Sequence, residues 1–421
     1  MTDVELLYPC CCGLDVHKKT VVACLVRTVT AGVRTKETRT FATTSAELET
    51  LRDWLAGAGC THAAMESTGV LWKPVYNVLA AAGGGLDVRV VNAAHVKAMP
   101  GRKTDVGDAE WIADLLQHGL LRPSFIPDQG QRELRDLTRT RTSLIDERSA
   151  AVRRLQKVLE DANIKLSGVA TDVMGVSGRA MLAALLAGTA DPAAMAELAK
   201  GKLRTKRAEL ERALTGRMRA HHRRLVAMHL AHIDFLDEQV AELSARIAEH
   251  LRPFEAELLR LETIPGVKRR TAEVLAAEIG LRMAQFPSAR HLAAWAGMAP
   301  GNNESAGKRK GGKTRKGSKW LRRALVEAAR AAARTKQPGR TAFAEQYRRL
   351  VGRAGPKKAA VAVGHAILTT VYYLLSRQTT YRETAPAALD ERRRARLRQR
   401  ALDHLAALGY HVTLAPKEVP A

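Results

Sequence analysis

Residues 11–28 read CCGLDVHKKTVVACLVRT, and this stretch predicts two adjacent β-strands joined by a polar turn. The first apolar run reaches Asp15, the turn holds His17, Lys18 and Lys19, and a second apolar run follows. Short apolar runs bounded by a turn are typical of buried strands. Asp15 is therefore expected on the first strand, close to the turn.

The chain downstream of this pair alternates strands with helices. It predicts a Thr-rich strand at 33–42, a helix from Ser45 to about Gly57 capped by Ser45, a strand at 62–67, a helix at about 70–82 and a strand at 86–92. Alternation of this kind indicates a mixed sheet covered by helices. The order of three strands, helix, strand, helix, strand resembles that of an RNase H-like fold.

Residues 101–117, GRKTDVGDAEWIADLLQ, predict an amphipathic helix that begins with two acids. Three residues apart on a helix, Asp105 and Asp108 would share one face with their Cβ atoms about 5–6 Å apart, close enough to share a divalent cation. The alternative is that Asp105 caps the helix and Asp108 is an acid of its first turn.

Two strand-borne acids extend this constellation. Asp15 lies on the first predicted strand and Glu66 at the end of the fourth, so Asp15, Glu66, Asp105 and Asp108 come from three separate elements. Mg²⁺ or Mn²⁺ suits such oxygen ligands, and a pair of ions about 3.5–4 Å apart supports in-line chemistry at phosphorus. Taken singly, Asp15 and Glu66 each favour a structural role over metal binding, but all four acids together favour metal binding.

The charge of the chain indicates a polyanionic partner. Lys and Arg number 68 against 43 Asp and Glu, a formal net charge of +25 with a pI near 10.3. Residues 1–120 hold 12 basic against 13 acidic residues, which leaves 56 against 30 for the remainder. A nearly neutral N-terminal part followed by a strongly basic remainder fits a metal-binding unit joined to nucleic-acid-binding parts. Binding to a membrane surface, or solubility alone, would also favour an excess of basic residues.

The five cysteines all lie in the nearly neutral N-terminal part, and none stands at a zinc-ligand spacing with histidine. Reduced, buried thiols of a cytosolic protein are the expected account. Neither a cleavable signal nor an apolar run of about 20 residues is found, so a soluble cytoplasmic protein without a membrane partner is expected.

The middle of the chain predicts long paired helices. One apolar stripe runs through Leu134, Leu137, Leu144, Leu155 and Leu159, and a second through Ile233, Leu236, Val240, Leu243, Ile247 and Leu251. The second alternates three and four residues, which is coiled-coil spacing, so the helices would form an antiparallel hairpin or dimerise. Between them, His221-His222-Arg223-Arg224 is interpreted as a solvated or phosphate-facing helix side, because no third metal ligand is evident.

Residues 261–280, LETIPGVKRRTAEVLAAEIG, predict a helix, a short hairpin and a second helix. In helix-hairpin-helix units a glycine lets backbone N–H groups approach a phosphate, a role that Gly266 would fill here. A plain helical turn would give a similar pattern.

Residues 301–319, GNNESAGKRKGGKTRKGSK, predict an irregular cationic loop that is either solvated or laid on phosphates. A serine at the start of such a loop becomes a nucleophile only if its proton is removed and the developing charge is neutralised. Spacing alone does not distinguish Ser305 from Ser318 or Thr314.

Several motifs in order carry a resemblance to a known family: GLDVHKK, MESTG, KTDVGDAEWIADLL, TIPGVKRRTAEVLAAEIG and the segment FPSARHLAAWAGMAPGNNESAGKRKGGKTRKGSKWLRRAL. Together they resemble the transposases of the insertion-sequence 110 family. That family joins an N-terminal RuvC-like DEDD domain to a C-terminal transposase domain through a coiled coil.

The resemblance implies an α/β plus all-α chain of four parts. These are a RuvC-like metal-binding domain at 8–125, a helical coiled-coil linker with an insertion at 126–255, a transposase domain with the serine loop at 256–380 and a basic tail at 381–421. Asp15, Glu66, Asp105 and Asp108 match the family's metal-binding tetrad, and Ser305 matches the serine that forms a covalent phosphoserine link with DNA. The active site would be a composite of both domains.

The resemblance also implies partners. These are the element's DNA ends and target, a structured bridge RNA that pairs with donor and target DNA, and further copies of the chain in a dimer or tetramer. Together with the cationic patches, it predicts nucleic-acid contacts at Lys18, Lys103, Gly266, Lys268, Arg269, Lys308, Arg309, Lys310, Lys313, Arg315, Lys316, Lys319, Arg322 and Arg323.

Two rival interpretations remain open. In the first, the chain is a metal-dependent DNA nuclease or junction resolvase in which water attacks and Ser305 only positions phosphate. In the second, it binds nucleic acid without catalysis and its acids are structural.

Overall fold

The computed structural model describes residues 6–28, 33–81, 85–98, 107–188, 191–301, 303–305, 307–311, 314–334, 341–383 and 386–410. Lys103, Asp105 and Lys313, three of the predicted site residues, lie outside the described residues. The chain forms two compact units, Met1–Pro127 and Asp128–Ala421.

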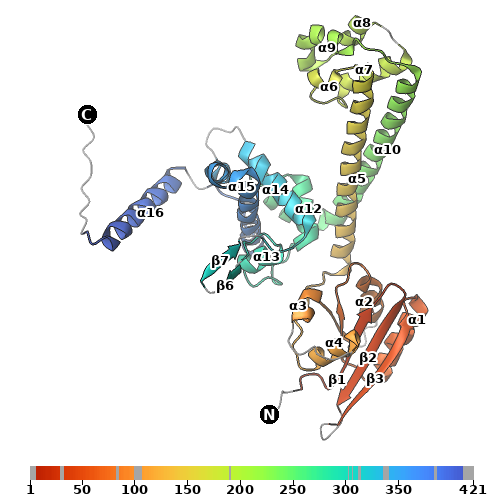
Figure 1. Ribbon diagram of the computed structural model, residues 1–421, viewed down its shortest axis with the longest axis vertical. Helices are drawn as coiled ribbons and strands as arrows, with labels where there is room; N and C mark the ends of the chain where they lie inside the picture. The colour runs from red at the N-terminus through yellow and green to blue at the C-terminus, as the bar shows by residue number, and fades with distance from the viewer. Residues whose placement is uncertain are drawn as a thin grey trace. The chain divides into compact units, whose positions relative to one another are not determined.

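The first unit is built on a five-stranded mixed sheet of order β3-β2-β1-β4-β5 (Figure 1). The strands β1, β2 and β3 are antiparallel, whereas β4 runs parallel to β1 and β5 runs parallel to β4. This arrangement confirms the predicted mixed sheet and its order of elements. Their bounds are β1 (Cys10–Val16), β2 (Thr20–Thr28), β3 (Arg34–Ala42), α1 (Ser45–Gly57), β4 (His62–Glu66), α2 (Trp72–Ala80), β5 (Asp87–Val91), α3 (Ala93–Ala98) and α4 (Asp108–Gln117).

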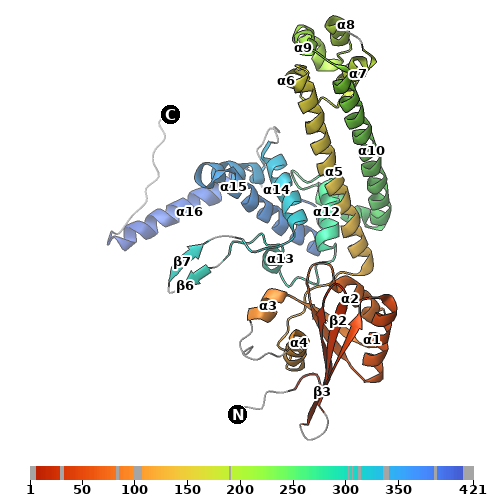
Figure 2. The same ribbon diagram turned by 45° about the vertical axis from the view of Figure 1, so that its right-hand side comes forward.

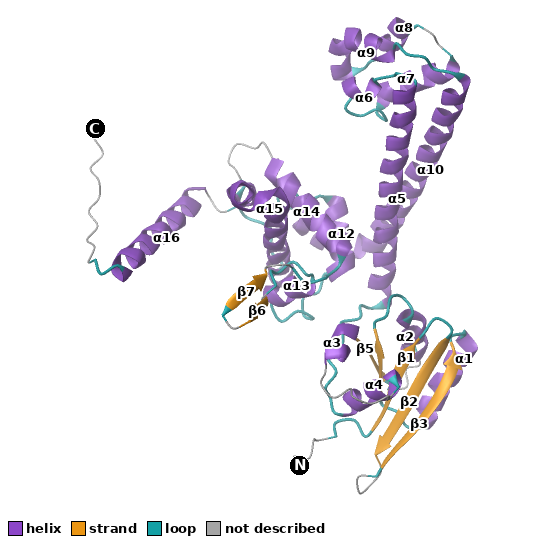
Figure 3. Cartoon of the chain, in the orientation of Figure 1, coloured by secondary structure: helices purple, strands orange, loops and turns teal. Residues whose placement is uncertain are grey.

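Helices cover both faces of this sheet, as Figure 3 shows. Leu51 of α1 and Leu79 of α2 pack on one face with Leu14, while Ile112 and Leu116 of α4 pack on the other with Ala64. A sheet buried on both faces explains why its central strands are nearly continuous apolar runs. The predicted cap of α1 was wrong by one residue, because Thr44 is the N-cap and Ser45 is already helical.

The second unit begins with a helical hairpin of α5 (Gln129–Asp161) and α10 (Ala220–Leu251), which lie side by side in both views (Figure 2). The second predicted stripe is confirmed, since Ile233, Leu236, Ile247 and Leu251 are buried. The hairpin therefore pairs two helices of one chain, the first of the two predicted alternatives.

Short helices occupy the far end of this hairpin. They are α6 (Leu166–Val169), α7 (Val176–Ala187), α8 (Pro192–Glu197), the 3₁₀ turn η2 (Gly201–Lys206) and α9 (Arg207–Leu214). Their apolar side chains, including Leu182 and Leu210, share a core with Leu155 and Val226 of the hairpin. The Ala-rich middle segment thus forms a small group of helices that shares a hydrophobic core with one end of the hairpin.

The remaining elements form the C-terminal core, with the tail helix following it. They are η3 (Arg252–Phe254), α11 (Glu255–Glu262), α12 (Arg269–Ile279), α13 (Ala289–Trp295), β6 (Asn303–Ser305), β7 (Lys308–Gly311), α14 (Lys319–Arg334), α15 (Ala342–Arg377) and α16 (Pro386–Ala407). Leu134 and Ile247 of the hairpin share this core with Leu275 and Leu321, so one end of the hairpin packs directly on the C-terminal core.

One helix has the length and composition of a membrane span, contrary to the expectation that no such apolar run exists. An 18-residue window of α15 has a mean hydropathy of 1.5, and half of that window is buried. Val363, Ile367 and Val371 pack in the C-terminal core, so burial in protein accounts for its apolar side chains. The helix is broken at Gly355, which has φ 78° and precedes Pro356.

Candidate active site

Two of the predicted acids are neighbours on the sheet. β1 pairs with β4 in parallel, with Leu14 opposite Met65, so the next residues, Asp15 and Glu66, stand side by side at the carboxyl ends of the two strands. Leu14 and Met65 are buried beneath α1 and α2. Because successive side chains alternate between faces, Asp15 and Glu66 point to the opposite face, the one that α4 covers.

α4 reaches this face through a glycine. A Cβ built on Gly13 would lie 2.0 Å from the carbonyl oxygen of Ala109 and 2.4 Å from the backbone nitrogen of Ala113. Only a residue without a side chain allows the helix backbone to approach the strand this closely. The contact places the first residue of α4, Asp108, on the same face as Asp15 and Glu66.

Cations on β3 hold α4 on this face from one side. Arg34 pairs with Asp114, and Lys36 pairs with Glu110 and lies 3.8 Å from Asp114. These pairs are partly exposed and contribute little energy individually. They nevertheless give Glu110 and Asp114, the two acids of α4 that follow Asp108, ion-pair partners on β3.

The described acids fit a hard divalent cation. Asp15, Glu66 and Asp108 offer carboxylate oxygens, the ligands that Mg²⁺ prefers, from three elements that converge on one face. Asp15 also pairs at 3.0 Å with His17, which is exposed in the turn after β1. The fourth predicted ligand, Asp105, lies outside the described residues, so the tetrad stays a prediction.

A different group of possible metal ligands occurs in the second unit. Asp161, His221 and His222 offer ligand atoms within 4.8 Å of one another, the one such group of three found among the described residues. The sequence did not reveal Asp161 as a third possible ligand, because it lies at the end of α5, far from both histidines in the sequence. The expected solvated side was wrong for His222, which is 1% exposed.

The hydrogen bonds of His222 argue against a metal there. Its Nδ1 accepts a hydrogen bond from the backbone N–H of Arg219, so Nε2 carries the ring proton, and Nε2 lies 2.8 Å from Asp161 Oδ2. Coordination through Nε2 would require Nδ1 to hold the ring proton. The Nδ1–H and the backbone N–H of Arg219 would then be two donors facing each other. The group is better explained as a cap that fastens the start of α10 to the end of α5.

No cysteine belongs to a group of three possible metal ligands among the described residues. All five are free, four are buried, and Cys10 is half-buried. Burial raises the pKa of Cys11 and of Cys60 to about 12. Buried, neutral thiols of this kind behave as small apolar side chains.

The predicted serine loop contains an antiparallel hairpin, which differs from the irregular loop expected. Ser305 at the end of β6 is in register with Lys308 at the start of β7. Gly307 in the connection has φ 71°, a conformation that favours glycine and permits a tight turn. The charged residues hid this hairpin because they lack the apolar alternation by which strands are recognised.

Two glycines close the base of the segment that carries Ser305. A Cβ on Gly317 would lie 2.2 Å from the carbonyl oxygen of Ala296, and one on Gly297 would lie 2.7 Å from that of Arg315. The two ends of the segment therefore cross with their backbones in contact.

Arg322 of α14 fastens this crossing. Its Nη2 donates to the carbonyl oxygen of Gly297, to Thr314 Oγ1 at 2.8 Å and to the carbonyl oxygen of Arg315 at 3.2 Å. It thus binds residues from both ends of the segment. The sequence assigned Arg322 to nucleic acid, and its contacts give it a role in holding the hairpin's base.

The other two hydroxyl candidates of the loop are occupied. Ser318 Oγ donates to Glu278 Oε2 at 2.8 Å and accepts from the backbone N–H of Leu321 at 3.2 Å, which caps α14. Thr314 Oγ1 accepts from Arg322. Either hydroxyl would have to leave these partners before it could attack a phosphate.

Glu278 is a residue that sequence reasoning missed. It is 1% exposed and accepts two hydrogen bonds from Arg139 of α5, at 2.7 and 2.9 Å, besides that of Ser318. A buried carboxylate needs such partners. Glu278 thereby links the helical hairpin to the end of the serine segment. Its one signal in the sequence is that it is an acidic residue within an apolar stretch of α12.

The predicted nucleic-acid contacts differ in their surroundings. Arg269 is paired with Glu255 at 2.6 Å, which raises the pKa of its guanidinium, and Arg323 is paired with Asp146 and Glu327. Lys319 lies over the ring of Trp320 at 4.9 Å. By contrast, the structure exposes the following residues: Lys18, Lys268, Arg315 and Lys316. For Lys308, Arg309 and Lys310 it describes only the strand that carries them.

Gly266 also has a structural explanation. It has φ 85°, and a Cβ there would lie 2.2 Å from the carbonyl oxygen of Ala328. The hairpin between α11 and α12 therefore packs its glycine directly on α14. Contact of Gly266 with a phosphate stays a prediction.

Two family models match the chain. Residues 12–164 match a model described as "Transposase", and residues 258–345 match one described as "Transposase IS116/IS110/IS902 family". The first includes Asp15, Glu66 and Asp108, and the second includes the serine segment with its base. Together the two models cover more than half of the chain.

Curated proteins from several bacteria are also similar. A "Probable family 20 transposase" of Pseudomonas aeruginosa is 26% identical over 71% of this chain and 80% of its own length. The "Transposase for insertion sequence element IS1111A" of Coxiella burnetii is 24% identical over 71% of this chain and 74% of its own length. The agreement of motif order, fold and two separate family models shows that this chain belongs to the IS110 family of insertion-sequence transposases.

Proposed function

We propose that this transposase cuts and rejoins DNA through a covalent phosphoserine at Ser305, assisted by a divalent cation at Asp15, Glu66, Asp105 and Asp108. The observation that carries the proposal is the convergence of Asp15, Glu66 and α4 on one face of the sheet, at the carboxyl ends of β1 and β4. Carboxylates so arranged suit the binding of a metal ion that works on phosphates.

In the proposed reaction, the Ser305 oxygen attacks phosphorus and loses its proton to a base. The bond from phosphorus to the leaving sugar oxygen breaks, and that oxygen takes up a proton. Attack by a sugar hydroxyl on the phosphoserine later reverses the exchange and releases the serine. Mg²⁺ or Mn²⁺ held by the acids would neutralise negative charge on the phosphate.

The hydrogen bonds of Ser318 and Thr314 support the choice of Ser305 as the nucleophile of this segment. Ser318 and Thr314 are engaged in hydrogen bonds that hold the segment's ends, whereas Ser305 adjoins the turn of the hairpin. The cationic strand β7 beside it supplies charge of the sign that a developing oxyanion needs.

Guidance by a bridge RNA, action on element ends and target, and assembly into a dimer or tetramer are part of the same proposal, on the strength of the family. The strongly basic second part of the chain suits polyanions of either kind. Delegating sequence choice to RNA pairing also suits a chain whose sequence shows no base-reading recognition helix.

The deciding experiment uses the full chain with element-end DNA, Mg²⁺ and RNA transcribed from the element's flank. The proposal expects a DNA band on a denaturing gel that is shifted until protease is added. Ser305→Ala should abolish this band, Ser318→Ala should keep it, and Asp15→Ala or Glu66→Ala should prevent its formation.

The second candidate function is metal-dependent hydrolysis with water as the nucleophile, which the same acids would support. It predicts cleaved DNA without a protease-sensitive adduct, even under conditions that trap one, and partial activity of Ser305→Ala. A binding protein without catalysis predicts that the Asp15→Ala and Glu66→Ala variants transpose normally in cells.

A further inference from the structure

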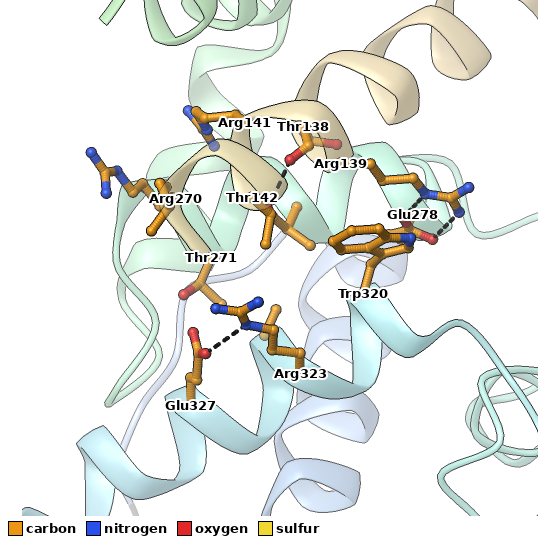
Figure 4. Close-up of a pocket in the computed structure, with 13 residues that line it drawn as sticks. Thr138, Arg139, Arg141, Thr142, Arg270, Thr271, Glu278, Trp320, Arg323 and Glu327 are labelled. Atoms are coloured by element: carbon orange, nitrogen blue, oxygen red, sulfur yellow. Dashed lines mark hydrogen bonds and ion pairs between the residues drawn. The ribbon is translucent and has the colours of Figure 1, made fainter. Parts of the chain in front are cut away.

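A cavity of about 160 Å³ lies between α5, α12 and α14 in the second unit (Figure 4). Trp320, Ile145 and Val274 supply much of its apolar lining. Trp320 is the second residue of α14, directly after the serine segment, and it is half-buried. The cavity is therefore part of the same compact unit as the proposed nucleophile, yet no role in the proposed chemistry uses it.

The charged groups around this cavity are mostly neutralised within the protein. Arg139 is paired with Glu278 at 2.7 Å, Arg141 with Glu273 at 2.7 Å, and Arg323 with Glu327 at 2.9 Å. Figure 4 shows the Arg139 and Arg323 pairs on different sides of the cavity. Arginines that already have carboxylate partners leave little net charge for a free phosphate or for a metal ion.

Arg270 is the exception. It is exposed at the rim, and the described residues offer its guanidinium no hydrogen bond or ion pair. In Figure 4 its side chain points outward from α12, away from Trp320. The cavity thus combines an indole ring and a few aliphatic side chains, set among polar lining residues, with a cation at its mouth that has no partner among the described residues. Lys319, whose Nζ lies 4.9 Å from the centre of the Trp320 ring, adds a second cation beside the indole.

A flat, uncharged ring attached to a phosphate matches this combination. Unpaired bases stack on aromatic side chains or guanidinium planes, and the phosphate of the same nucleotide needs a nearby cation. We propose that this cavity takes one unpaired base of the bound nucleic acid, stacked on Trp320, with the adjoining phosphate contacting Arg270. The inference rests on the proposed function in so far as nucleic acid is the partner of this unit.

Photocrosslinking tests the contact directly. The full-length Ser305→Ala chain, which the proposal makes unable to form the adduct, is mixed with single-stranded DNA or with RNA of the same sequence, each carrying 5-iodouracil. Irradiation should join the modified base to the peptide that contains Trp320, as read by mass spectrometry. Crosslinks at other peptides alone would overturn the proposal, and the yields of the two arms tell DNA from RNA.

Binding measurements supply a second test. Trp320→Ala should weaken binding about 5- to 150-fold, as expected for loss of one base–aromatic stack, while Trp320→Phe keeps most of the affinity. Arg270→Gln should weaken binding. The plot of log affinity against log salt concentration should also become less steep by about 0.7, the value for one phosphate contact with a single strand. Tyr373→Ala is the matched control, because it removes an aromatic ring that is 44% exposed on α15.

The outcomes separate this inference from the proposed function. A crosslink at Trp320 without any phosphoserine adduct in the wild-type chain would overturn only the serine chemistry. An adduct at Ser305 together with unchanged binding by Trp320→Ala and Trp320→Phe would overturn only the base-binding cavity. Melting temperatures of each variant, compared with the wild type, show whether a lost affinity reflects lost folding.

Discussion

Ser318 donates a 2.8 Å hydrogen bond to Glu278, a carboxylate that is only 1% exposed. The same hydroxyl caps α14 by accepting from Leu321. Ser318→Ala should therefore lower the free energy of unfolding by about 1–3 kcal/mol, since a cap is lost and a buried acceptor loses a donor. Chemical denaturation measures the loss, and the phosphoserine adduct should persist.

The control for this variant is Ser149→Ala. Ser149 is an exposed serine of α5 whose hydroxyl donates, within the described part of the chain, only to the carbonyl oxygen of Ile145, one turn earlier. Its replacement should leave the free energy of unfolding nearly unchanged. Equal stability of the Ser149→Ala and Ser318→Ala chains would show that the Glu278 hydrogen bond contributes nothing.

The fold of the first unit followed from local patterns in the sequence. The apolar runs around Leu14 and Leu25 and the helix-spaced leucines of α1 are each visible within a few residues. Period and turn chemistry are local properties, so they are readable before the chain is folded. The α/β plus all-α class was predictable for this reason.

The details of the candidate site depended on contacts between distant residues. The pairing of Glu278 with Arg139, 139 residues away, and the crossing of Gly297 with Gly317 leave no periodic signal. The hairpin at Ser305 was missed because its strands are polar. The acids and the serine of the proposed site were named from the order of the motifs, and their roles stay predictions.

Gly13→Ala should disable the proposed metal site without touching an acid. The added methyl would lie 2.0 Å from the Ala109 carbonyl, so α4 has to move away from β1. We expect a loss of about 1–3 kcal/mol in the free energy of unfolding from overpacking, and a large drop in Mg²⁺-dependent DNA cleavage. Thermal melts and the cleavage assay report the two effects.

Gly57→Ala serves as the comparison for Gly13→Ala. Gly57 is the last residue of α1, and a Cβ there meets nothing within 4 Å. This variant should melt at or slightly above the wild-type temperature and cleave DNA normally. If the Gly13→Ala chain cleaves DNA as well as the Gly57→Ala chain, the close approach of α4 is not needed for the site.

Arg322→Gln should loosen the base of the serine segment. The guanidinium binds Gly297, Thr314 and Arg315, and glutamine is too short to serve all three acceptors. We expect faster proteolysis after Glu304 by a glutamate-specific protease and a lower yield of the Ser305 adduct. The cleavage product is identified by its mass.

Arg330→Gln is the matched variant on the same helix, since Arg330 is exposed on α14. It removes the same charge but no contact with the segment, so the rate of cleavage after Glu304 should not change. Equal rates in the Arg322→Gln and Arg330→Gln chains would argue that Gly297 and Gly317 hold the crossing unaided.

Neighbouring histidines allow the cap at the start of α10 to be distinguished from a metal site. His222 is buried between Arg219 and Asp161, whereas His221 is exposed. If the group is a cap, His222→Ala lowers the melting temperature and His221→Ala leaves it unchanged. Zn²⁺ at neutral pH should then shift the wild type no more than either variant.

The pH dependence of the same pair gives an independent check. The hydrogen bond from His222 lowers the pKa of Asp161 below its ordinary value. A lowered carboxyl pKa contributes stability above the unfolded pKa of about 3.9, and this contribution is lost as pH falls through the folded value. The melting-temperature gap between wild type and His222→Ala should therefore narrow in acid. Because Asp161 is 69% exposed, the change should be small. A Zn²⁺-dependent rise in melting temperature that both His221→Ala and His222→Ala abolish would instead establish a metal site and refute the cap.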